Sequence, residues 1–402
     1  MLELEEALAR ILATVPAPVS ETVLLNAAHK RIATGRVTSP IDLPIFDNSA
    51  MDGYAIRAAE VASAKADAPV RLRLGGRVAA GESFAGEMAA AACIRVFTGS
   101  PLPRGADAVV MQEDTRVEPG TPQDILILEP TKPWENVRLR GEDIKQGTVL
   151  ANEGDLLTAG RISLLAASGI AQIKAGRQPV IGLLATGSEL REPGQTLGAG
   201  NIYESNRIGL SALIRQAGAI PIIFSIVPDT AQDVRGALEL AFNQCDAVVT
   251  SGGVSVGEMD FVKGAFEAVG GELQFWRVAV KPGRPFVFGR HGEKFLFGLP
   301  GNPVSALVTF LLLVRPALLR WQGAADVSLP AYSGVLAEPL ANPGPRRHFI
   351  RVKVDSDGKI FSAGAQASHV LSSLADANGL VDVPPGTTMM AETAVQVLRW
   401  GD

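Results

Sequence analysis

The sequence predicts a multidomain α/β protein: a doubly wound α/β domain with a mostly β insert, a helical linking unit and a small C-terminal β barrel. Three observations support this. The 402 residues exceed what one ordinary core holds, and 47% of them are hydrophobic. Apolar strand-like runs alternate with amphipathic helical patterns in the segment 178–325. Short β-like runs separated by Pro and Gly turns occupy much of the remainder.

The first unit is expected to be discontinuous. Residues 1–42 open with a helical pattern and lead into PIDLPIFDNSAMDGYAI, where Pro, Asp and Gly end regular structure. Helical periodicity returns after residue 154. We therefore expect 143–177 to rejoin 1–42 in one linking domain.

The segment 43–142 reads as the β insert. Its runs VRLRL, CIRVF, AVVMQ and ILILE are rich in β-branched and apolar residues, and the turns PRG and EPGTPQ separate them. Strands of this length with such turns indicate a small sheet domain.

The segment 178–325 reads as the doubly wound domain. Helical patterns at Asn206–Ala217, after Asp229 and after AVVT each have one apolar face, between the apolar runs VIGLLAT, IPIIFSIV and AVVT. Nearly continuous apolar strands are typical of a parallel sheet covered on both sides. The last apolar segment is interrupted by Arg315 and Pro316 before it reaches the roughly 20 residues that span a bilayer, so it predicts a buried helix.

The segment 326–402 contains short alternating runs such as FIRVKV and LVDVPP and no convincing long helix. We expect a small β barrel here.

Composition excludes several classes of function. The net charge of −5 opposes sequence-independent binding of nucleic acid, which needs clustered Lys and Arg. The acidic opening MLELEEALAR is unlike a secretory signal. Cys93 and Cys245 are far apart and the four His lack metal-binding spacing. We expect a cytoplasmic protein, not bound to a membrane, whose metal sites use carboxylates.

Three strand ends in the α/β domain carry glycine-rich turns: LLATGSEL, VVTSGGVSVGEMD and FLFGLPGNPVSA. In open α/β sheets, ligands bind beyond the carboxyl ends of the strands. Gly187, Gly252, Gly253 and Gly301 would let backbone amides approach an anion, although each could serve a tight turn alone. Asn302-Pro303 resembles an N-cap followed by proline at the first helical position. Neither GxxxxGK[ST] nor GxGxxG occurs in the right context, so ordinary nucleotide folds lose support.

Charged residues follow the same strands. Glu189, Asp229 and Asp260 would bring three carboxylates to one rim, which suits Mg²⁺; for Asp229 alone, an N-cap is the simpler interpretation. Across from them, FWRVAVKPGRP places Arg277, Lys281 and Arg284 around a Pro-Gly turn. The sequence predicts a polarised cleft that holds an oxyanion beside a metal-phosphate group.

The ordered motifs resemble the MoeA-type molybdopterin molybdenumtransferases, a family that includes the C-terminal domain of gephyrin. The resemblance covers nearly the whole chain. It is carried by PIFDNSAMDGYA, RVFTGSPLPRGADAVV, RLRGEDIKQG, LLATGSEL, GNIYESN, VVTSGGVSVGEMDF, VAVKPGRPFVFG, GLPGNPVSA and SSLADANGL.

The resemblance implies a Mg²⁺-dependent reaction in which molybdate is inserted into adenylylated molybdopterin while the bond between the pterin phosphate and AMP is cleaved. It further implies a homodimer with its active site between the subunits. The partners it suggests are the upstream adenylyltransferase and downstream factors that mature molybdoenzymes.

Carried over by motif, the resemblance implies catalytic roles for Asp52, Thr98, Asp143, Glu189, Asp229, Asp260 and Lys281. It places in the binding site Gly187, Ser251, Gly252, Gly253, Arg277, Lys281, Pro300, Gly301, Pro303, Arg346 and Ser368. Whether Arg346 or Arg347 faces the anion stays open, as do the individual roles of the carboxylates and the choice between molybdate and tungstate. Where many relatives have a second acid, this chain has Ser188.

Two alternatives remain. One is an adenylyltransferase or nucleotide-hydrolysing enzyme with a similar α/β domain, although such relatives lack the insert and the barrel. The other is a non-catalytic cofactor carrier or scaffold, which the acidic and basic positions of this chain oppose.

Overall fold

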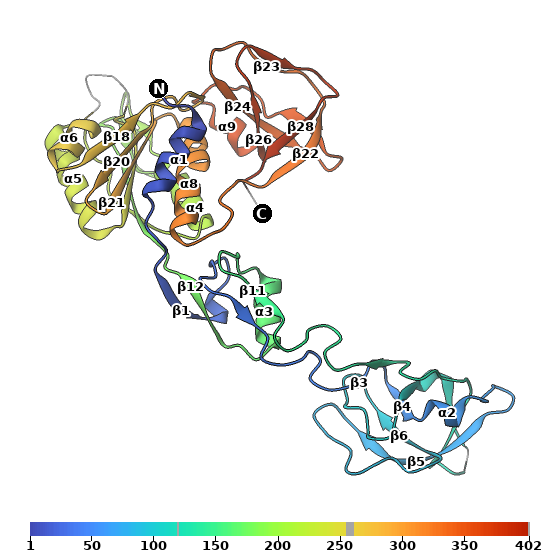
Figure 1. The fold of residues 1–402 in the computed structure, drawn as a ribbon. Coiled ribbons are helices and arrows are strands. Elements are labelled where there is room, and N and C mark those ends of the chain that lie inside the picture. The colour runs from blue at the N-terminus through green and yellow to red at the C-terminus, as the bar shows by residue number, and fades with distance from the viewer. Residues whose placement is uncertain (119, 255–260, 401–402) are drawn as a thin grey trace.

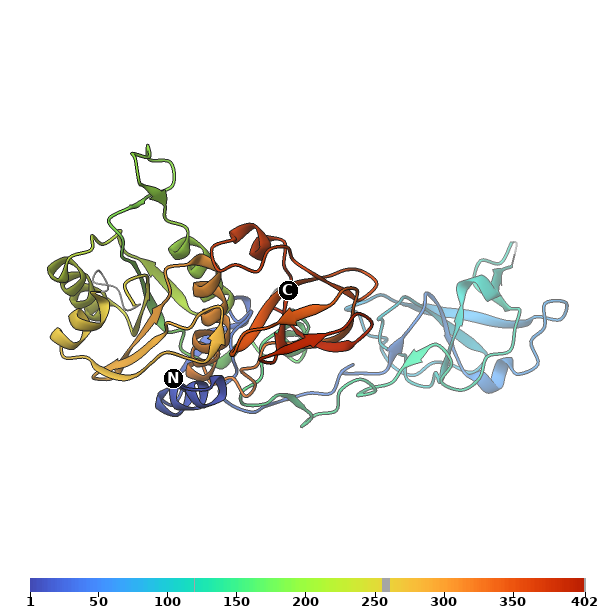
Figure 2. The same ribbon diagram turned by 90° about the horizontal axis from the view of Figure 1, so that it is seen from above.

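The computed structural model describes residues 1–118, 120–254 and 261–400. The molecule is elongated, with the α/β and C-terminal domains at one end, the linking unit in the middle and the insert at the far end (Figure 1). The view from above shows the same order (Figure 2).

The α/β domain is built on a six-stranded sheet in the order β16-β13-β17-β21-β20-β18. The first four strands run parallel. The expected parallel sheet also carries an antiparallel edge, because β20 is antiparallel to both of its neighbours. The reason is local: only Gly292 and Glu293 separate β20 from β21, and a two-residue connection can join only antiparallel strands. The strands are β13 (Val180–Ala185), β16 (Ile220–Ile223), β17 (Ala247–Ser251), β18 (Glu272–Trp276), β20 (Val287–His291) and β21 (Lys294–Leu299).

Helices cover both faces of this sheet, as a doubly wound fold requires. On one face, Leu210 and Ile214 of α4 (Asn206–Gln216) share a core with the C-terminal helices of the domain. On the other face, α5 (Ala231–Gln244) and α6 (Val262–Ala268) bury their apolar side chains in a second core. The expected helix positions are confirmed to within a few residues.

A long helical segment runs from Pro303 to Trp321 and consists of α7 (Pro303–Thr309), a π-helical turn η3 (Phe310–Val314) and α8 (Arg315–Trp321). The π turn precedes Pro316, which lacks an N–H and would clash with the carbonyl of a regular preceding turn. The segment is long and apolar enough to cross a membrane, but 78% of its apolar window is buried inside the protein. It is the core helix that the sequence predicts.

The first helix, α1 (Leu4–Thr14), lies away from the linking unit to which its residues were assigned. Leu4, Ala7 and Ile11 are buried in the core of the α/β domain, where α1 contacts η3 and α8. The position of α1 is therefore determined by the core that buries its apolar face. Its closeness in sequence to the strands of the linking unit does not determine that position.

The linking unit is formed by the two chain segments that flank the insert. β1 (Ser20–Leu24) pairs with β12 (Gln172–Gly176), and β2 (Val37–Thr38) pairs with β11 (Val149–Ala151). A short η1 (Leu25–Ala27) and α3 (Ala159–Ala167) complete it. The unit is built from two separate segments of the chain, and strands contribute to it as much as helix does.

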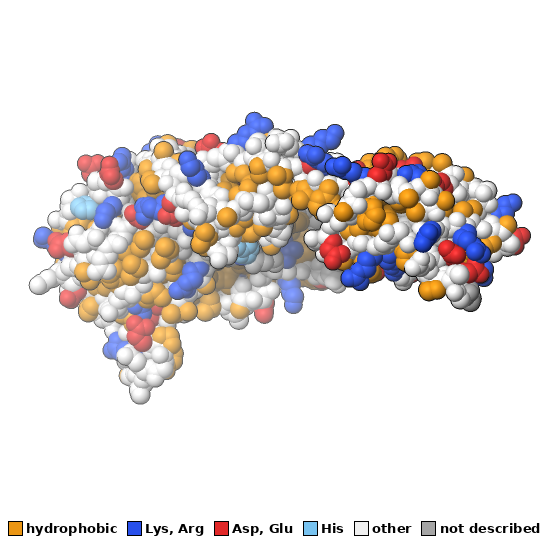
Figure 3. All heavy atoms as spheres, turned by 90° about the horizontal axis from the view of Figure 1, so that it is seen from below, with side chains coloured by type: hydrophobic (Ala, Val, Ile, Leu, Met, Phe, Trp, Pro, Cys, Tyr) orange, Lys and Arg blue, Asp and Glu red, His pale blue; other side chains and the backbone are white. Residues whose placement is uncertain are grey.

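The insert contains a six-stranded sheet in the order β7-β4-β6-β5-β9-β8. A separate pair, β3 (Asn48–Ser49) with β10 (Val137–Arg138), joins its two ends. Acidic and basic side chains are interspersed over the face of the insert shown in Figure 3. The remaining elements are β4 (Gly53–Ile56), α2 (Ala58–Val61), β5 (Val70–Val78), β6 (Ala92–Val96), β7 (Ala108–Met111), η2 (Gln112–Asp114), β8 (Thr115–Val117) and β9 (Asp124–Ile127).

The C-terminal domain is a closed five-stranded barrel, because β24-β25-β22-β28-β26 is completed by pairing of β26 with β24. A short strand from the α/β domain, β19 (Val280–Lys281), pairs with β24 and joins the two domains. The elements are β22 (Ala331–Leu336), β23 (Leu340–Asn342), β24 (Arg347–Val354), β25 (Lys359–Ser362), α9 (Leu371–Ala375), β26 (Gly379–Val383), β27 (Thr387–Met389) and β28 (Ala394–Leu398).

One segment of the α/β domain projects from its body. It carries the paired strands β14 (Leu190–Arg191) and β15 (Ile202–Tyr203) and lies between β13 and α4 (Figure 2). We call residues 190–203 the arm.

Candidate functional site

A large cleft lies where the carboxyl ends of β13, β17 and β21 face the C-terminal domain. Its volume is about 1360 Å³. Twelve of the residues expected from the sequence line it: Gly187, Glu189, Asp229, Ser251, Gly252, Gly253, Lys281, Pro300, Gly301, Pro303, Arg346 and Ser368. The three glycine-rich turns lie together because the parallel sheet places the carboxyl ends of its strands at one edge.

The turn after β17 needs its glycines. Gly252 has φ of 90°, and a Cβ there would lie 2.9 Å from the Thr186 carbonyl oxygen. Gly253 has φ of 66°, and its Cβ would meet the Thr186 hydroxyl and Val262 at 2.8 Å. Both the backbone conformation and the close approach of the β13 turn exclude larger residues.

The turn after β21 leads into α7. Pro303 occupies the start of this helix, as expected, but the Asn302 side chain forms no cap hydrogen bond. Its Nδ2 instead donates to the Ser368 hydroxyl at 3.0 Å, and the backbone N–H of Val304 donates to the Ser368 carbonyl at 3.2 Å. A loop of the C-terminal domain thus accepts hydrogen bonds from the first residues of the helix, and these bonds hold Ser368 at the cleft.

The two described carboxylates of the expected metal set both line the cleft. Asp229 accepts from the Ser188 backbone N–H at 2.9 Å, while the Ser188 hydroxyl accepts from the Asp229 N–H at 3.1 Å. Thr230 is the N-cap of α5 and its side chain accepts from Asp233, so the capping interpretation of Asp229 is excluded. Neither Glu189 nor Asp229 forms an ion pair with a described residue.

Asp260, the third expected carboxylate, lies outside the described residues. Within the described part of the chain, no group of three or more His, Cys, Asp and Glu side chains is placed to hold a metal ion. Two cleft carboxylates nevertheless fit Mg²⁺, which takes one or two protein carboxylates and completes its shell with water and phosphate oxygens.

Cations form the opposite wall. Lys281, Arg284 and Arg346 line the cleft, and the Arg346 Nη1 donates to the Val280 carbonyl at 2.7 Å. Burial, and then the charge of Arg284, lower the pKa of Arg346. The positive charge of this wall is therefore concentrated and partly desolvated, an environment that favours an anion.

The structure distinguishes the two candidate arginines. Arg347 forms ion pairs with Asp382 and Glu5, and the hydrogen bonds that its guanidinium donates to Asp382 are the main cause that raises its pKa. The Arg347 guanidinium is therefore held by two carboxylates that do not line the cleft, whereas Arg346 precedes β24 and forms no ion pair with a described residue. Arg346 is the one that lines the cleft.

Beneath this wall, His348 is buried on β24 opposite Lys281. Burial, followed by the charges of Lys281, Arg351 and Arg346, lowers the pKa of His348 to about 4. The imidazole is therefore neutral at neutral pH and adds no charge to the cleft.

Arg277 is not brought to the cleft. Its guanidinium lies 4.3 Å from the centre of the Trp276 ring, and its backbone pairs with Phe286 and Leu2. The residue has φ of 88°, so the chain turns immediately after β18.

Asp52, Thr98 and Asp143 also lie outside the cleft. The Asp52 Oδ1 accepts from the Thr98 backbone N–H at 2.8 Å and from its hydroxyl at 3.0 Å, on the exposed surface of the insert. The hydrogen bond from the Thr98 backbone, and to a lesser extent the one from its hydroxyl, hold the pKa of Asp52 below its ordinary value of 3.8. Asp143 is exposed in the segment that returns from the insert. The insert and the α/β domain occupy opposite ends of one chain (Figure 1).

Other cleft residues were not among the site residues expected from the sequence. Asn206 lies in the GNIYESN motif, so the motif contained a signal for it, and Asn302 was interpreted only as a cap. Gln366 and His369 have no local pattern that marks them. The additional polar residues are Thr186, Glu204, Ser205, Asn206, Asn302, Ser305, Gln366 and His369, while Arg284 was already among the cations that the sequence places in the cleft.

Three family models match the chain in succession. Residues 2–169 match the MoeA N-terminal region (domain I and II), residues 182–320 a probable molybdopterin binding domain, and residues 333–400 the MoeA C-terminal region (domain IV). Together they cover nearly the whole sequence.

Curated relatives match over similar lengths. The molybdopterin molybdenumtransferase of Haemophilus influenzae is 38% identical over 94% of this chain and 93% of its own. Molybdopterin molybdenumtransferase 2 of Mycobacterium tuberculosis is 38% identical over 94% of both chains. The Bacillus subtilis molybdopterin molybdenumtransferase is 32% identical over 96% of this chain and 91% of its own.

Solved structures agree with the fold. A molybdopterin biosynthesis MoeA protein of Pyrococcus horikoshii OT3 superposes with a TM-score of 0.82 at 30% identity and covers all of both chains. A second structure of a Pyrococcus horikoshii MoeA protein gives a TM-score of 0.79 at 33% identity over 99% of each chain.

Proposed function

The chain belongs to the MoeA family of molybdopterin molybdenumtransferases, and from that premise we propose the reaction of its cleft. The protein acts in molybdenum cofactor biosynthesis and inserts molybdenum into molybdopterin. The proposed substrates are adenylylated molybdopterin and molybdate, and the products are molybdenum cofactor and AMP. The observation that carries this proposal is one cleft that combines glycine turns, two carboxylates and a wall of cations.

The glycine turns are proposed to hold the phosphates of the adenylylated pterin. Their backbone amides are fixed before the substrate binds, so they stabilise charge that develops on phosphate oxygens without reorganisation. The long helix that starts at Pro303 directs the positive end of its dipole toward the same turn.

The cationic wall is proposed to hold molybdate, which is a dianion. Lys281 and Arg346 place it beside the pterin, and Ser368 offers a hydroxyl at the same edge of the cleft. Holding two reactants in one orientation removes much of the entropic barrier of a reaction between them.

Glu189 and Asp229 are proposed to hold Mg²⁺, together with Asp260. When bound, this ion would neutralise charge on the phosphates during cleavage of the bond to AMP. Glu189 is exposed and Asp229 is held by Ser188, so one carboxylate is free to adapt while the other is fixed.

The active site is proposed to be completed by a second copy of the chain. Asp52, Thr98 and Asp143 are exposed and lie outside the cleft of their own chain, so they would act on the cleft of a partner in a homodimer. Cytoplasmic location and delivery of substrate by an upstream adenylyltransferase belong to the same proposal.

The test uses purified protein, adenylylated molybdopterin, Mg²⁺ and molybdate, with AMP release as the measurement. We expect AMP release that molybdate stimulates. Equal AMP release with and without molybdate would indicate a nucleotide-hydrolysing enzyme, and formation of the adenylylated pterin from ATP would indicate an adenylyltransferase.

A further inference from the structure

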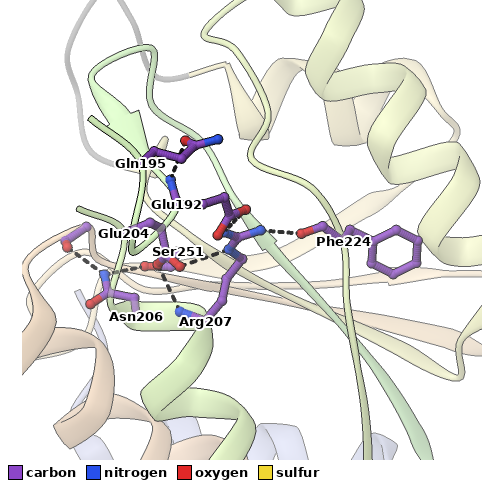
Figure 4. A network of polar contacts seen from close by, with 8 residues as sticks. Glu192, Gln195, Glu204, Asn206, Arg207, Phe224 and Ser251 are labelled. Atoms are coloured by element: carbon purple, nitrogen blue, oxygen red, sulfur yellow. Dashed lines mark hydrogen bonds and ion pairs between the residues drawn. The ribbon is translucent and has the colours of Figure 1, made fainter. Parts of the chain in front are cut away.

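The side-chain amide of Asn206 connects the two glycine turns of the cleft (Figure 4). Its Nδ2 donates to the Ser251 hydroxyl oxygen at 2.7 Å and to the Gly301 carbonyl at 2.7 Å. The Ser251 hydroxyl in turn donates to the Pro300 carbonyl at 3.4 Å. Both amide hydrogens are therefore used, one toward each turn.

This connection begins where the backbone pairing of the strands ends. β17 and β21 are adjacent, with Ser251 opposite Leu299, and the Gly252 N–H donates to the Leu299 carbonyl at 3.1 Å. A Cβ on Gly301 would lie 3.5 Å from the Gly252 Cα, so the turns come close, but no further backbone hydrogen bond joins them among the described residues. Beyond the last ladder bond, the Asn206 amide sets their spacing.

The amide acts on the protein and is not offered to a ligand. Asn206 is 9% exposed, and its Oδ1 is buried and has no hydrogen-bond partner among the described residues. Asn206 belongs to the cleft lining, but both of its amide N–H groups are used within the protein. The amide therefore acts on the cleft through the two turns.

The start of α4 is itself rigidly held, which fixes Asn206. Arg207 pairs with Glu204 at 2.9 Å, and both side chains are almost completely buried. Arg207 also pairs with Glu192 of the arm at 2.8 Å and donates to the Phe224 carbonyl after β16 (Figure 4). These contacts tie the helix start to the arm and to the edge of the sheet.

We propose that Asn206 is a positioning residue that holds the two glycine turns at the spacing required by the phosphates of the substrate. The proposal deepens the function assigned above and rests on it for the identity of the substrate. Its physical basis is the two amide N–H groups: without them, the turns after β17 and β21 can move apart.

The test compares Asn206→Ala, which removes the amide, with Asn206→Asp, which keeps its shape but replaces both donors by an acceptor. We expect each variant to lower kcat/KM for molybdate-dependent AMP release by about 100-fold, most of it in kcat, because small misplacements of positioned groups cost this much. Wild-type kinetics in Asn206→Asp would show that the donors are unimportant and would overturn the proposal.

A binding measurement separates this inference from the proposed reaction. Inorganic pyrophosphate serves as the probe in calorimetry, and we expect its affinity to fall about tenfold in both variants, the scale of one lost hydrogen bond. Weaker pyrophosphate binding in a protein that never releases AMP would reject the reaction and keep the positioning role. Normal AMP release and normal pyrophosphate binding in both variants would reject the positioning role alone.

Two further variants complete the design. Asn201→Ala removes an amide of the arm that accepts only from the local Gly198 N–H, and it should behave as wild type. In a double-mutant cycle, Asn206→Ala should lower kcat/KM by a smaller factor in a Ser251→Ala background than in the wild type. The reason is that the Asn206 hydrogen bond to Ser251 is already absent there. An equal loss of kcat/KM in both backgrounds would show that Asn206 does not act through the turn after β17.

Discussion

The cleft of the α/β domain and the Asp52 edge of the insert are built in opposite ways. In the cleft, Ser251 and Asn206 are buried and their side chains hydrogen-bond to neighbouring turns. On the insert, Asp52 and Thr98 are exposed and the bonds described for the Asp52 carboxylate are those from Thr98. The first region is a preformed binding site, while the second presents an ionised group to its surroundings.

The difference explains why one chain holds only part of the expected site. Buried hydrogen bonds preorganise the cleft for an anionic ligand at its own surface. An exposed carboxylate with a lowered pKa has no function in its own cleft when it lies at the far end of an elongated chain. This division supports the proposal of a site shared between two copies.

The largest expected effect concerns the buried pair beneath the cleft. Arg207→Ala leaves Glu204 buried without its cation, so we expect the free energy of unfolding to fall by about 3–5 kcal/mol. Urea denaturation followed by fluorescence measures it. Arg71→Ala is the matched control on the insert: its pairs with Glu118 and Asp124 are exposed, and it should change stability by less than about 1 kcal/mol. Similar losses in both variants would remove the distinction between the two regions.

The next effect concerns activity. Lys281→Ala removes a cation from the cleft wall, and we expect AMP release to fall by about 100-fold or more. Asp52→Ala should also lower AMP release severely, although Asp52 lies outside the cleft of its own chain. Size-exclusion chromatography should show unchanged assembly in both variants. Full AMP release in both would show that neither side chain takes part in the reaction, whereas no AMP release even by the unmodified protein would favour the scaffold or carrier interpretation.

Mixing these two variants sharpens the comparison. If Asp52 serves the cleft of a partner, a mixed dimer contains one intact site, and random exchange of subunits restores about a quarter of wild-type AMP release. Exchange is verified with two differently tagged chains. If AMP release does not recover after verified exchange, Asp52 of one chain and Lys281 of the other do not form one active site.

The smallest effect concerns the protonation of Asp52. Because its pKa is lowered in the folded protein, the Thr98 bonds stabilise the fold fully above pH 3.8 and less as pH falls through the lower folded pKa. Thr98→Val removes the hydroxyl but keeps the backbone N–H, so the Asp52 pKa should rise part of the way toward 3.8. A carboxyl titration by NMR measures it, with Thr98→Ser as the control that keeps the donor. An unchanged pKa in Thr98→Val would assign the whole shift to the backbone.

Local patterns predicted those features that depend on neighbouring residues. The helices α4 and α5, the glycine turns and the start of α7 follow from apolar periodicity and turn residues, and the structure confirms them. The antiparallel β20 was missed because its apolar run resembles a buried parallel strand, and the direction depends on the short Gly292-Glu293 connection. The place of α1 was missed because periodicity shows an apolar face without showing which core receives it.

The cleft residues show the same limit. Glu189 and the glycines follow strands of the parallel sheet, so that sheet brings them together, whereas Lys281 reaches the cleft on β19, which pairs with β24 of the barrel. Arg346 and Arg347 are adjacent in sequence and equal in charge, and only the ion pairs of Arg347 with Asp382 and Glu5 separate them. Gln366 and His369 enter the cleft on a loop of another domain, which no local pattern reveals.

The sequence by itself determined the family and the doubly wound domain, because turn residues and apolar periods are patterns of consecutive residues. Only the tertiary structure decided that Asn302 binds Ser368, that Arg277 stacks on Trp276 outside the cleft and that Asn206 joins two turns. The hydrogen bonds of Asn206 and Asn302 join residues that are 45 to 95 positions apart in the sequence. They depend on which side chains remain buried once the domains pack. Burial and hydrogen bonding across domains are properties of the assembled chain, and for that reason the partners of a polar side chain cannot be read from its neighbours in sequence.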